Sequence, residues 1–235
     1  WLYNNSLPGP EIRIKEGELL DVYFKNKLAT PTTIHWHGVK VPNAMDGVSG
    51  LTQPAVEPGE AFSYKFRIFE PGTYWYHAHT MGWEQVARGL YGPLIVEGVK
   101  DFETDHDITM MVDDWRLDKD GQIDQASMGS LHDWAHRGRL GNWLTINGKS
   151  QFKTSVKINS RIRLRLINSS NARILKLKLT GGVGLRVSLD GNPSNLASIS
   201  KFELGPAQRI DLLLDVGNEP LFLHDLSSRE KILAG

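Results

Sequence analysis

Two short pairs of histidines are the residues best suited to chemistry in this sequence. His35 and His37 flank a tryptophan, and His77 and His79 flank an alanine. Each pair ends a run rich in β-branched or aromatic residues, which is typical of a strand. Because residues i and i+2 of a strand point to the same face, each pair should present both imidazoles on one side.

Four imidazoles that meet in one place would suit copper, zinc, iron or nickel better than magnesium or calcium. One such pair among the eight histidines of the chain could be a packed polar pair. Two pairs on strands of one domain favour a metal site. The neighbouring aromatic residues Trp36, Trp75 and Tyr76 are expected to pack in the core rather than to relay electrons.

The elements that must position these histidines are predicted to be β-strands. Glycine and proline interrupt the chain at short intervals, and the runs between them alternate, which favours an all-β sandwich or barrel. Only residues 83–88 suggest a helical turn. Predicted strands of the first part cover 11–14, 19–24 and 61–68; those of the second part cover 108–112, 156–158, 161–166 and 175–179.

A domain boundary is expected between Gly98 and Thr104, giving one domain at 1–100 and another at 101–235. The order of turns and strands in the two parts is similar, which predicts two tandem domains of one Greek-key type. In the predicted strands 161–166 and 175–179 the cationic residues alternate with apolar ones and are expected to face water.

Composition excludes several classes of function. The 27 basic residues balance the 27 acidic ones, so neither a nucleic-acid partner nor a polybasic membrane contact is indicated. No apolar run is long enough to span a membrane, and no signal peptide is present. The chain opens inside an apparent strand, so we expect that an upstream segment has been removed. Cysteine is absent, so this chain cannot form a blue-copper site by itself.

Several motifs together resemble the first domain of multicopper oxidases, the family that includes laccases and bacterial copper-resistance oxidases. The resemblance runs almost unbroken from Tyr3 to Glu97 and implies cupredoxin-like Greek-key domains. Its main motifs are Thr33-Ile34-His35-Trp36-His37-Gly38, Met45-Asp46-Gly47-Val48, Tyr74-Trp75-Tyr76-His77-Ala78-His79 and Gly89-Leu90-Tyr91-Gly92-Pro93-Leu94-Ile95-Val96.

The resemblance implies a trinuclear copper cluster that reduces dioxygen to water with electrons from a separate type 1, or blue, copper. By position in the family motifs, His35 would bind the type 2 copper, and His37, His77 and His79 would bind the type 3 pair. Asp46 matches a family acid just outside the cluster, where a carboxylate can orient a histidine or water and relay protons. Its other interpretation is a turn aspartate before Gly47.

The sequence departs from the family because nothing in it matches the remaining cluster histidines or the blue-copper ligands. We therefore expect a third cupredoxin domain, in the same chain or in another. The family further implies a phenol, an aromatic amine or Cu(I) as reductant, and a periplasmic or secreted location. The second domain is expected to be structural, since its histidine pair is reduced to His224-Asp225-Leu226.

Alternatives remain open at this stage. The chain could be a non-catalytic cupredoxin-repeat protein that binds copper or acts as a scaffold. A copper nitrite reductase fits poorly, because its first domain would need a cysteine. His132 and His136 are spaced to align on a helix, where a metal role is possible but an ordinary surface turn is the simpler interpretation. His106 and His224 are interpreted in the same way.

Overall fold

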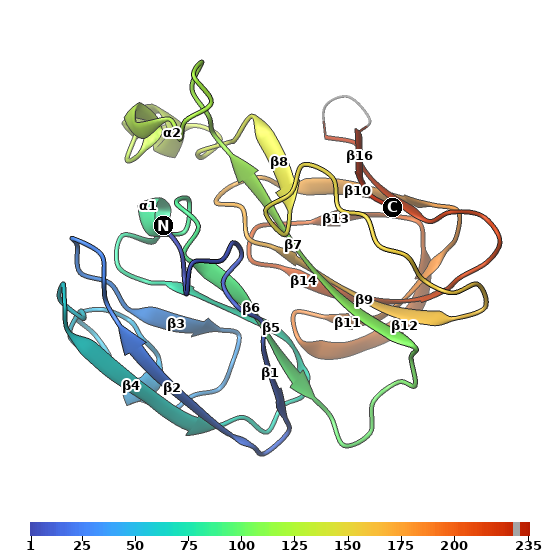
Figure 1. Cartoon of the computed structure of the whole chain (residues 1–235), viewed down its shortest axis with the longest axis horizontal. Helices are drawn as coiled ribbons and strands as arrows, with labels where there is room; N and C mark the ends of the chain where they lie inside the picture. Colours follow the sequence, from blue (N-terminus) through green and yellow to red (C-terminus); the bar gives the residue numbers. More distant parts are fainter. Residues whose placement is uncertain (228–230) are drawn as a thin grey trace. The chain divides into compact units, whose positions relative to one another are not determined.

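The computed structural model describes residues 1–227 and 231–235, which fold as two compact units, Trp1–Asp101 and Phe102–Gly235. Strands dominate both units, so the predicted all-β class is confirmed (Figure 1). No helix in these residues combines the length and the apolar character that a membrane crossing requires.

Unit 1 contains a four-stranded sheet in the order β1-β6-β5-β3 and a two-stranded sheet of β2 and β4. Neighbouring strands are antiparallel except β1 and β6, which run parallel. The elements are β1 (Ile12–Lys15), β2 (Leu19–Lys25), β3 (Ile34–His37), the 3-10 turn η1 (Asn43–Met45), β4 (Ala61–Arg67), β5 (Gly72–Ala78), the short helix α1 (Gly82–Gln85) and β6 (Tyr91–Glu97).

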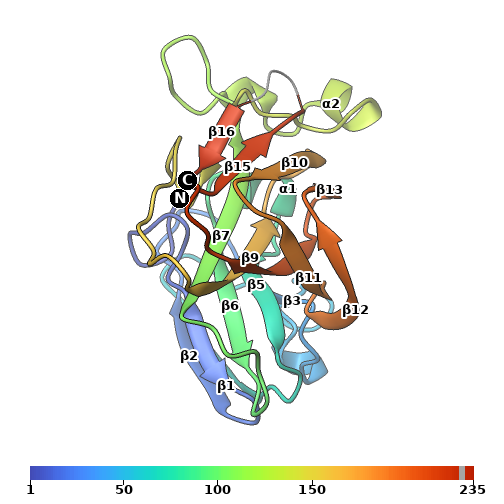
Figure 2. The same cartoon turned by 90° about the vertical axis from the view of Figure 1, so that its right-hand side faces the viewer.

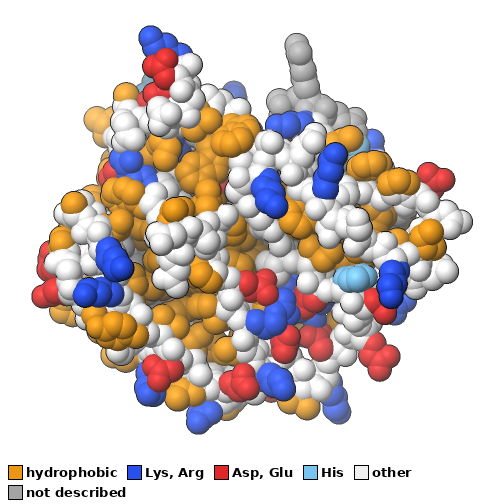
Figure 3. Space-filling view, viewed as in Figure 1, with side chains coloured by type: hydrophobic (Ala, Val, Ile, Leu, Met, Phe, Trp, Pro, Cys, Tyr) orange, Lys and Arg blue, Asp and Glu red, His pale blue; other side chains and the backbone are white. Residues whose placement is uncertain are grey.

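The core of unit 1 is aromatic and lies behind β3 and β5. Trp36 is fully buried, and its ring packs against those of Tyr64, Phe66 and Tyr76. A cavity of about 740 Å³ opens beside β2, and Figure 3 shows hydrophobic side chains reaching the surface in this part of the unit. This cavity is lined in part by Ile34 and Trp36 of β3 and by Tyr76 of β5.

Unit 2 contains a six-stranded sheet in the order β12-β11-β14-β9-β7-β8 and a four-stranded sheet in the order β13-β10-β15-β16. Strand β7 runs parallel to β9, beside which it lies in Figure 2. The elements are β7 (His106–Trp115), the 3-10 turn η2 (Gln125–Ser127), α2 (Leu131–Ala135), β8 (Trp143–Ile146), β9 (Arg161–Asn168), β10 (Leu175–Thr180), β11 (Gly184–Leu189), β12 (Asn192–Ile199), β13 (Lys201–Leu204), β14 (Arg209–Asp215), β15 (Phe222–Asp225) and β16 (Lys231–Ala234).

The prediction that the arginines of β9 face water is wrong for two of them. Arg163 and Arg165 are buried, and both donate to the carboxylate of Asp211 on the adjacent strand β14, at 2.7 Å and 3.2 Å. Arg165 also binds Asp107 of β7 at 2.6 Å. Acids on both neighbouring strands therefore compensate the arginine charges, which a single strand's alternation does not reveal.

The strand predicted at residues 156–158 is not present. Val156 is half-buried, whereas Lys157 and Ile158 are exposed in an irregular segment that ends in a turn. The turn places Asn159 at φ +63°, and Ser160 donates from its hydroxyl to the carbonyl of Lys157. Two β-favouring residues, Val156 and Ile158, are too few to fix a strand when the next residues form a turn.

Candidate metal centre

Strands β3 and β5 lie side by side and place three of the four histidines. In their antiparallel register His35 is directly opposite His77, and His37 is opposite Trp75. Because side chains alternate along a strand, Ile34 and Trp36 enter the core while the histidines project from the other face. The spacing of His35 and His37 thus places both imidazoles on one face of β3, as the sequence predicts.

The imidazoles of His35, His37 and His77 converge. Each supplies one ring nitrogen such that the three atoms lie within 4.8 Å of one another, the only such group of three or more His, Cys, Asp or Glu residues in the described parts of the chain. The ring centroids are 5.3 Å apart for His35 and His77 and 5.5 Å apart for His37 and His77. Converging imidazole nitrogens of this kind can hold a transition-metal ion.

His79 lies beside this group but is not part of it. It follows the end of β5, where its backbone N–H donates to the carbonyl of Thr33 at 3.3 Å. Its ring centroid is 5.0 Å from that of His35 and 6.0 Å from that of His77. The structure therefore brings all four predicted histidines together, with three of them at close range.

Hydrogen bonds indicate which ring nitrogen carries the proton in His35 and in His77. Nδ1 of His35 lies 2.8 Å from the carbonyl oxygen of Asp46, and Nδ1 of His77 lies 2.9 Å from that of Ala78. A carbonyl only accepts, so each Nδ1 carries the proton and Nε2 keeps its lone pair. Nδ1 of His37 lies 3.2 Å from Nε2 of His77, and since this Nε2 can only accept, a hydrogen bond between the two rings has His37 as its donor.

Burial favours the neutral form of His77 and of His35. It lowers the pKa of His77 to about 3, and the nearby histidines add to the shift. The ring of Trp75 packs on His77, with 4.3 Å between centroids, and supplies part of that burial. Burial also lowers the pKa of His35, although the hydrogen bond to Asp46 partly opposes it. Neutral imidazole is the form that binds metals.

The turn at Asp46 fixes the orientation of the His35 ring through contacts to its Nδ1. Its carbonyl makes the 2.8 Å contact, while its carboxylate oxygen Oδ1 lies 3.4 Å from the same Nδ1. Gly47 permits this approach, since it has φ +77° and a Cβ there would lie 1.8 Å from the carbonyl oxygen of Ile34. Sequence reasoning noted the Asp-Gly turn but did not foresee that the backbone carbonyl makes the shorter contact.

Helix α1 is tied to the residues that precede β3 by a side chain that sequence reasoning missed. Gln85 is fully buried; its Oε1 accepts from the Thr32 hydroxyl at 2.6 Å, and its Nε2 donates to the carbonyl of Pro31 at 2.8 Å. These bonds fix the segment that follows His79. No sequence signal marks this glutamine, because its partners lie more than 50 residues away.

The remaining histidines singled out in the sequence belong to unit 2. His224 lies on β15, and its Nε2 is 2.8 Å from the hydroxyl of Thr180 on β10. His106 begins β7. His132 and His136 lie on and just after α2, with their rings stacked. None of the four belongs to the converging group of unit 1.

Comparison with known proteins identifies both units. Residues 1–101 and residues 106–221 each match a family model described as multicopper oxidase. Copper resistance protein A of Pseudomonas syringae pv. tomato is 28% identical over 90% of this chain and 42% of that protein. Laccase-2 of Cryptococcus neoformans var. grubii is 29% identical over 90% of this chain and 40% of that protein.

A solved structure agrees over the whole chain. The multicopper oxidase of Pseudomonas thermotolerans superimposes with a TM-score of 0.93 and 34% identity, covering 100% of this chain and 57% of that one. The chain spans about half the length of the curated relatives it matches. With matched models over both units and cupredoxin-fold oxidases as structural neighbours, the chain belongs to the multicopper oxidase family.

Proposed function

We propose that this chain is the two-domain portion of a laccase-like multicopper oxidase, in which His35, His37, His77 and His79 hold part of a trinuclear copper cluster. The observation that carries the proposal is the convergence of three ring nitrogens within 4.8 Å, with His79 beside them. The chain's membership in the family supports copper as the metal.

The donor set fits copper. Imidazole suits both copper oxidation states, and rigid strands fix ligand positions closely. Nδ1 of His37 and Nε2 of His77 face each other at 3.2 Å, where two lone pairs would repel unless a proton or a cation lay between them. Copper supplies, when bound, the one-electron chemistry by which dioxygen is reduced to water.

Each residue has a distinct role in this proposal. His35 would bind the type 2 copper, while His37, His77 and His79 would bind the type 3 pair. The Asp46 carbonyl orients His35 by accepting a hydrogen bond from Nδ1–H. The Asp46 carboxylate, about one-third exposed, is placed to accept and pass on a proton. Trp75 and the core behind β3 limit the access of water to the rings.

The rest of the oxidase would come from residues outside this sequence. The chain contains no cysteine, so a blue type 1 copper requires a cysteine-bearing third domain in the same or another chain. That domain would also complete the trinuclear cluster. We propose phenols, aromatic amines or Cu(I) as reductants and a periplasmic or secreted location. A non-catalytic scaffold is not favoured, because the relatives are oxidases and all four histidines are present.

The test is copper content together with the visible spectrum of the purified chain after copper loading and desalting. Retained copper without blue absorption is the expected result, because the chain can bind copper through imidazole but has no thiolate. Blue absorption with a second polypeptide present would identify the cysteine-bearing domain. A chain that retains no copper would overturn the proposal.

A further inference from the structure

The segment around α2 in unit 2 carries a second histidine pair that the proposed oxidase chemistry does not use. His132 and His136 are four residues apart, and their rings stack with centroids 4.3 Å apart and planes inclined by 20°. Ser130 caps the turn by accepting from the N–H of Asp133 at 3.3 Å, and Gly138 donates to the carbonyl of Asp133 at 2.8 Å. The turn therefore places the ring of His136, the C-cap residue, beside that of His132. Because a lone pair lies in its ring plane, one of the stacked rings must turn before both can bind one ion.

The free nitrogens of this pair are those that a metal would use. Nδ1 of His136 lies 2.8 Å from the carbonyl oxygen of His132, so it carries the ring proton and leaves the Nε2 lone pair free. Within residues 1–227 and 231–235, Nε2 of neither ring has a hydrogen-bond partner. A histidine that ligates through one nitrogen commonly donates from the other to a backbone carbonyl.

The surroundings of the pair are polar and carry charges of both signs. Both histidines are exposed, and beside them lies a cavity of about 490 Å³ that is lined by both rings, Arg116, Asp133 and Arg137, among others. Arg116 is paired with Asp133 at 2.8 Å and with Asp124 at 3.3 Å. Its charge is therefore compensated locally, and the cavity leaves room for water to complete a coordination shell.

We propose that His132 and His136 form a transition-metal site on α2, with Cu(II) as the preferred ion. Two imidazoles four residues apart, one on α2 and one at its C-cap, can bind one ion once their rings turn toward it, and imidazole suits copper, nickel and zinc. Among divalent first-row ions the affinity of such a site is highest for Cu(II). This site is made of residues other than those of the proposed oxidase cluster and does not rest on the proposed function.

The test adds Cu²⁺ to the metal-free chain and compares it with the variant His132→Ala/His136→Ala. Copper bound per chain is measured by electron paramagnetic resonance, and the position of the ion by broadening of backbone amide NMR signals. The unaltered chain is expected to bind one more Cu²⁺ than the variant and to lose the amide signals of residues 131–138. Each single substitution should raise Kd about tenfold or more, and excess Zn²⁺ should restore the signals.

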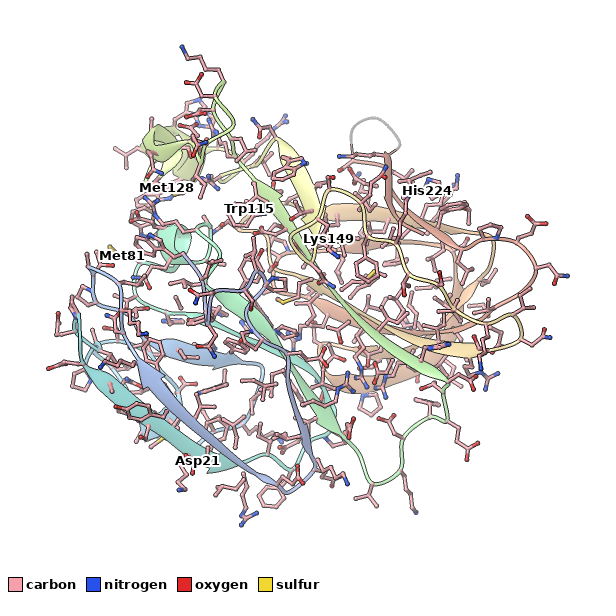
Figure 4. All side chains as sticks on the ribbon, viewed as in Figure 1. Asp21, Met81, Trp115, Met128, Lys149 and His224 are labelled. Atoms are coloured by element: carbon pink, nitrogen blue, oxygen red, sulfur yellow. The ribbon has the colours of Figure 1, made fainter. Side chains whose placement is uncertain are left out.

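His224→Ala is the matched control, because His224 also belongs to unit 2 but lies on β15, away from the α2 segment marked by Met128 in Figure 4. It should leave the additional copper and the broadening unchanged. Thermal melting shows whether a variant keeps its fold. The variant His132→Gln/His136→Gln keeps polar side chains, so loss of copper from it reflects loss of the ligands and not loss of the turn. Equal copper content and equal broadening in a folded double variant would overturn the proposal.

Discussion

Nδ1 of His37 lies 3.2 Å from Nε2 of His77, across the pair formed by strands β3 and β5. The other nitrogen of His77 is engaged with the carbonyl of Ala78, so its Nε2 can only accept. Two rings from distant parts of the sequence therefore direct nitrogen atoms at the same point. This relationship is the basis for treating β3 and β5 as the scaffold of a metal centre.

The depressed pKa of His77 predicts that the metal-free protein loses stability in acid. Folding holds this pKa at about 3 against 6.5 in the unfolded chain, so the unfolded state binds the proton first as pH falls below 6.5. Between about pH 7 and about pH 5 the free energy of unfolding of unit 1 should fall by about 2 kcal/mol from this group. Urea unfolding at the two pH values measures the loss.

His77→Asn is the matched variant for that experiment, since asparagine stays neutral at both pH values. The variant should lack the part of the acid-dependent fall in unfolding free energy that the His77 ring contributes, whatever its stability at neutral pH. An undiminished fall in His77→Asn would show that other groups are responsible and that the ring of His77 is not held neutral by burial.

The alternation of the two His-x-His motifs was enough to predict a common face for the imidazoles, because strand periodicity is strict. It could not predict which ring nitrogens are free, since these depend on the carbonyls of Asp46 and Ala78 in the folded backbone. Nor could it reveal Gln85, whose partners are distant in sequence.

The two wrong predictions, exposed arginines on β9 and a strand at 156–158, both come from applying a local sequence pattern alone. Alternation along one strand assigned the arginines of β9 to water, whereas Asp211 and Asp107 on the neighbouring strands pair with them in a buried position. The alternating segment 156–158, with Val156 and Ile158, suggested a strand, yet the turn at Asn159 and Ser160 prevents it. Both outcomes depend on neighbours that a local pattern does not contain.

Gly47→Ala is predicted to disrupt the turn behind His35. The new Cβ would meet the carbonyl oxygen of Ile34 at 1.8 Å, so the Asp46 carbonyl would have to move away from the His35 ring. We expect a loss of more than about 3 kcal/mol in the free energy of unfolding, with reduced copper retention. Gly50→Ala is the control, because Gly50 has a similar φ of +78° but nothing within 4 Å; it should cost roughly 1 kcal/mol. Equal effects of the two substitutions would contradict the assigned role of Gly47.

Asp46→Asn separates the two contacts of that residue. The backbone carbonyl, which makes the shorter contact with His35, is unchanged in this variant. Copper retention should therefore persist, while in the complete oxidase the rate of dioxygen reduction should fall because the amide cannot accept a proton. Loss of copper from a folded Asp46→Asn protein would instead mean that the carboxylate, and not the carbonyl, positions the ring.

Asp211→Asn is predicted to destabilise unit 2 strongly. It removes the carboxylate that compensates two buried arginines, and breaking a buried ion pair costs about 3–5 kcal/mol. Asp215→Asn makes the same chemical change on the same strand, but Asp215 is 73% exposed where it pairs with Arg161, so little change in stability is expected. Urea unfolding of both variants provides the comparison, and similar stabilities would show that the buried network does not hold β9 and β14 together.

The most direct test of the central claim is tightly bound copper per chain in His37→Ala/His79→Ala, measured against the unaltered protein and the control His106→Ala. The four-histidine assignment predicts that the double variant retains its fold but loses the copper that unit 1 holds through desalting, beyond any copper held by His132 and His136, while His106→Ala keeps it. Unchanged copper content in a folded double variant would contradict the assignment of these histidines as copper ligands.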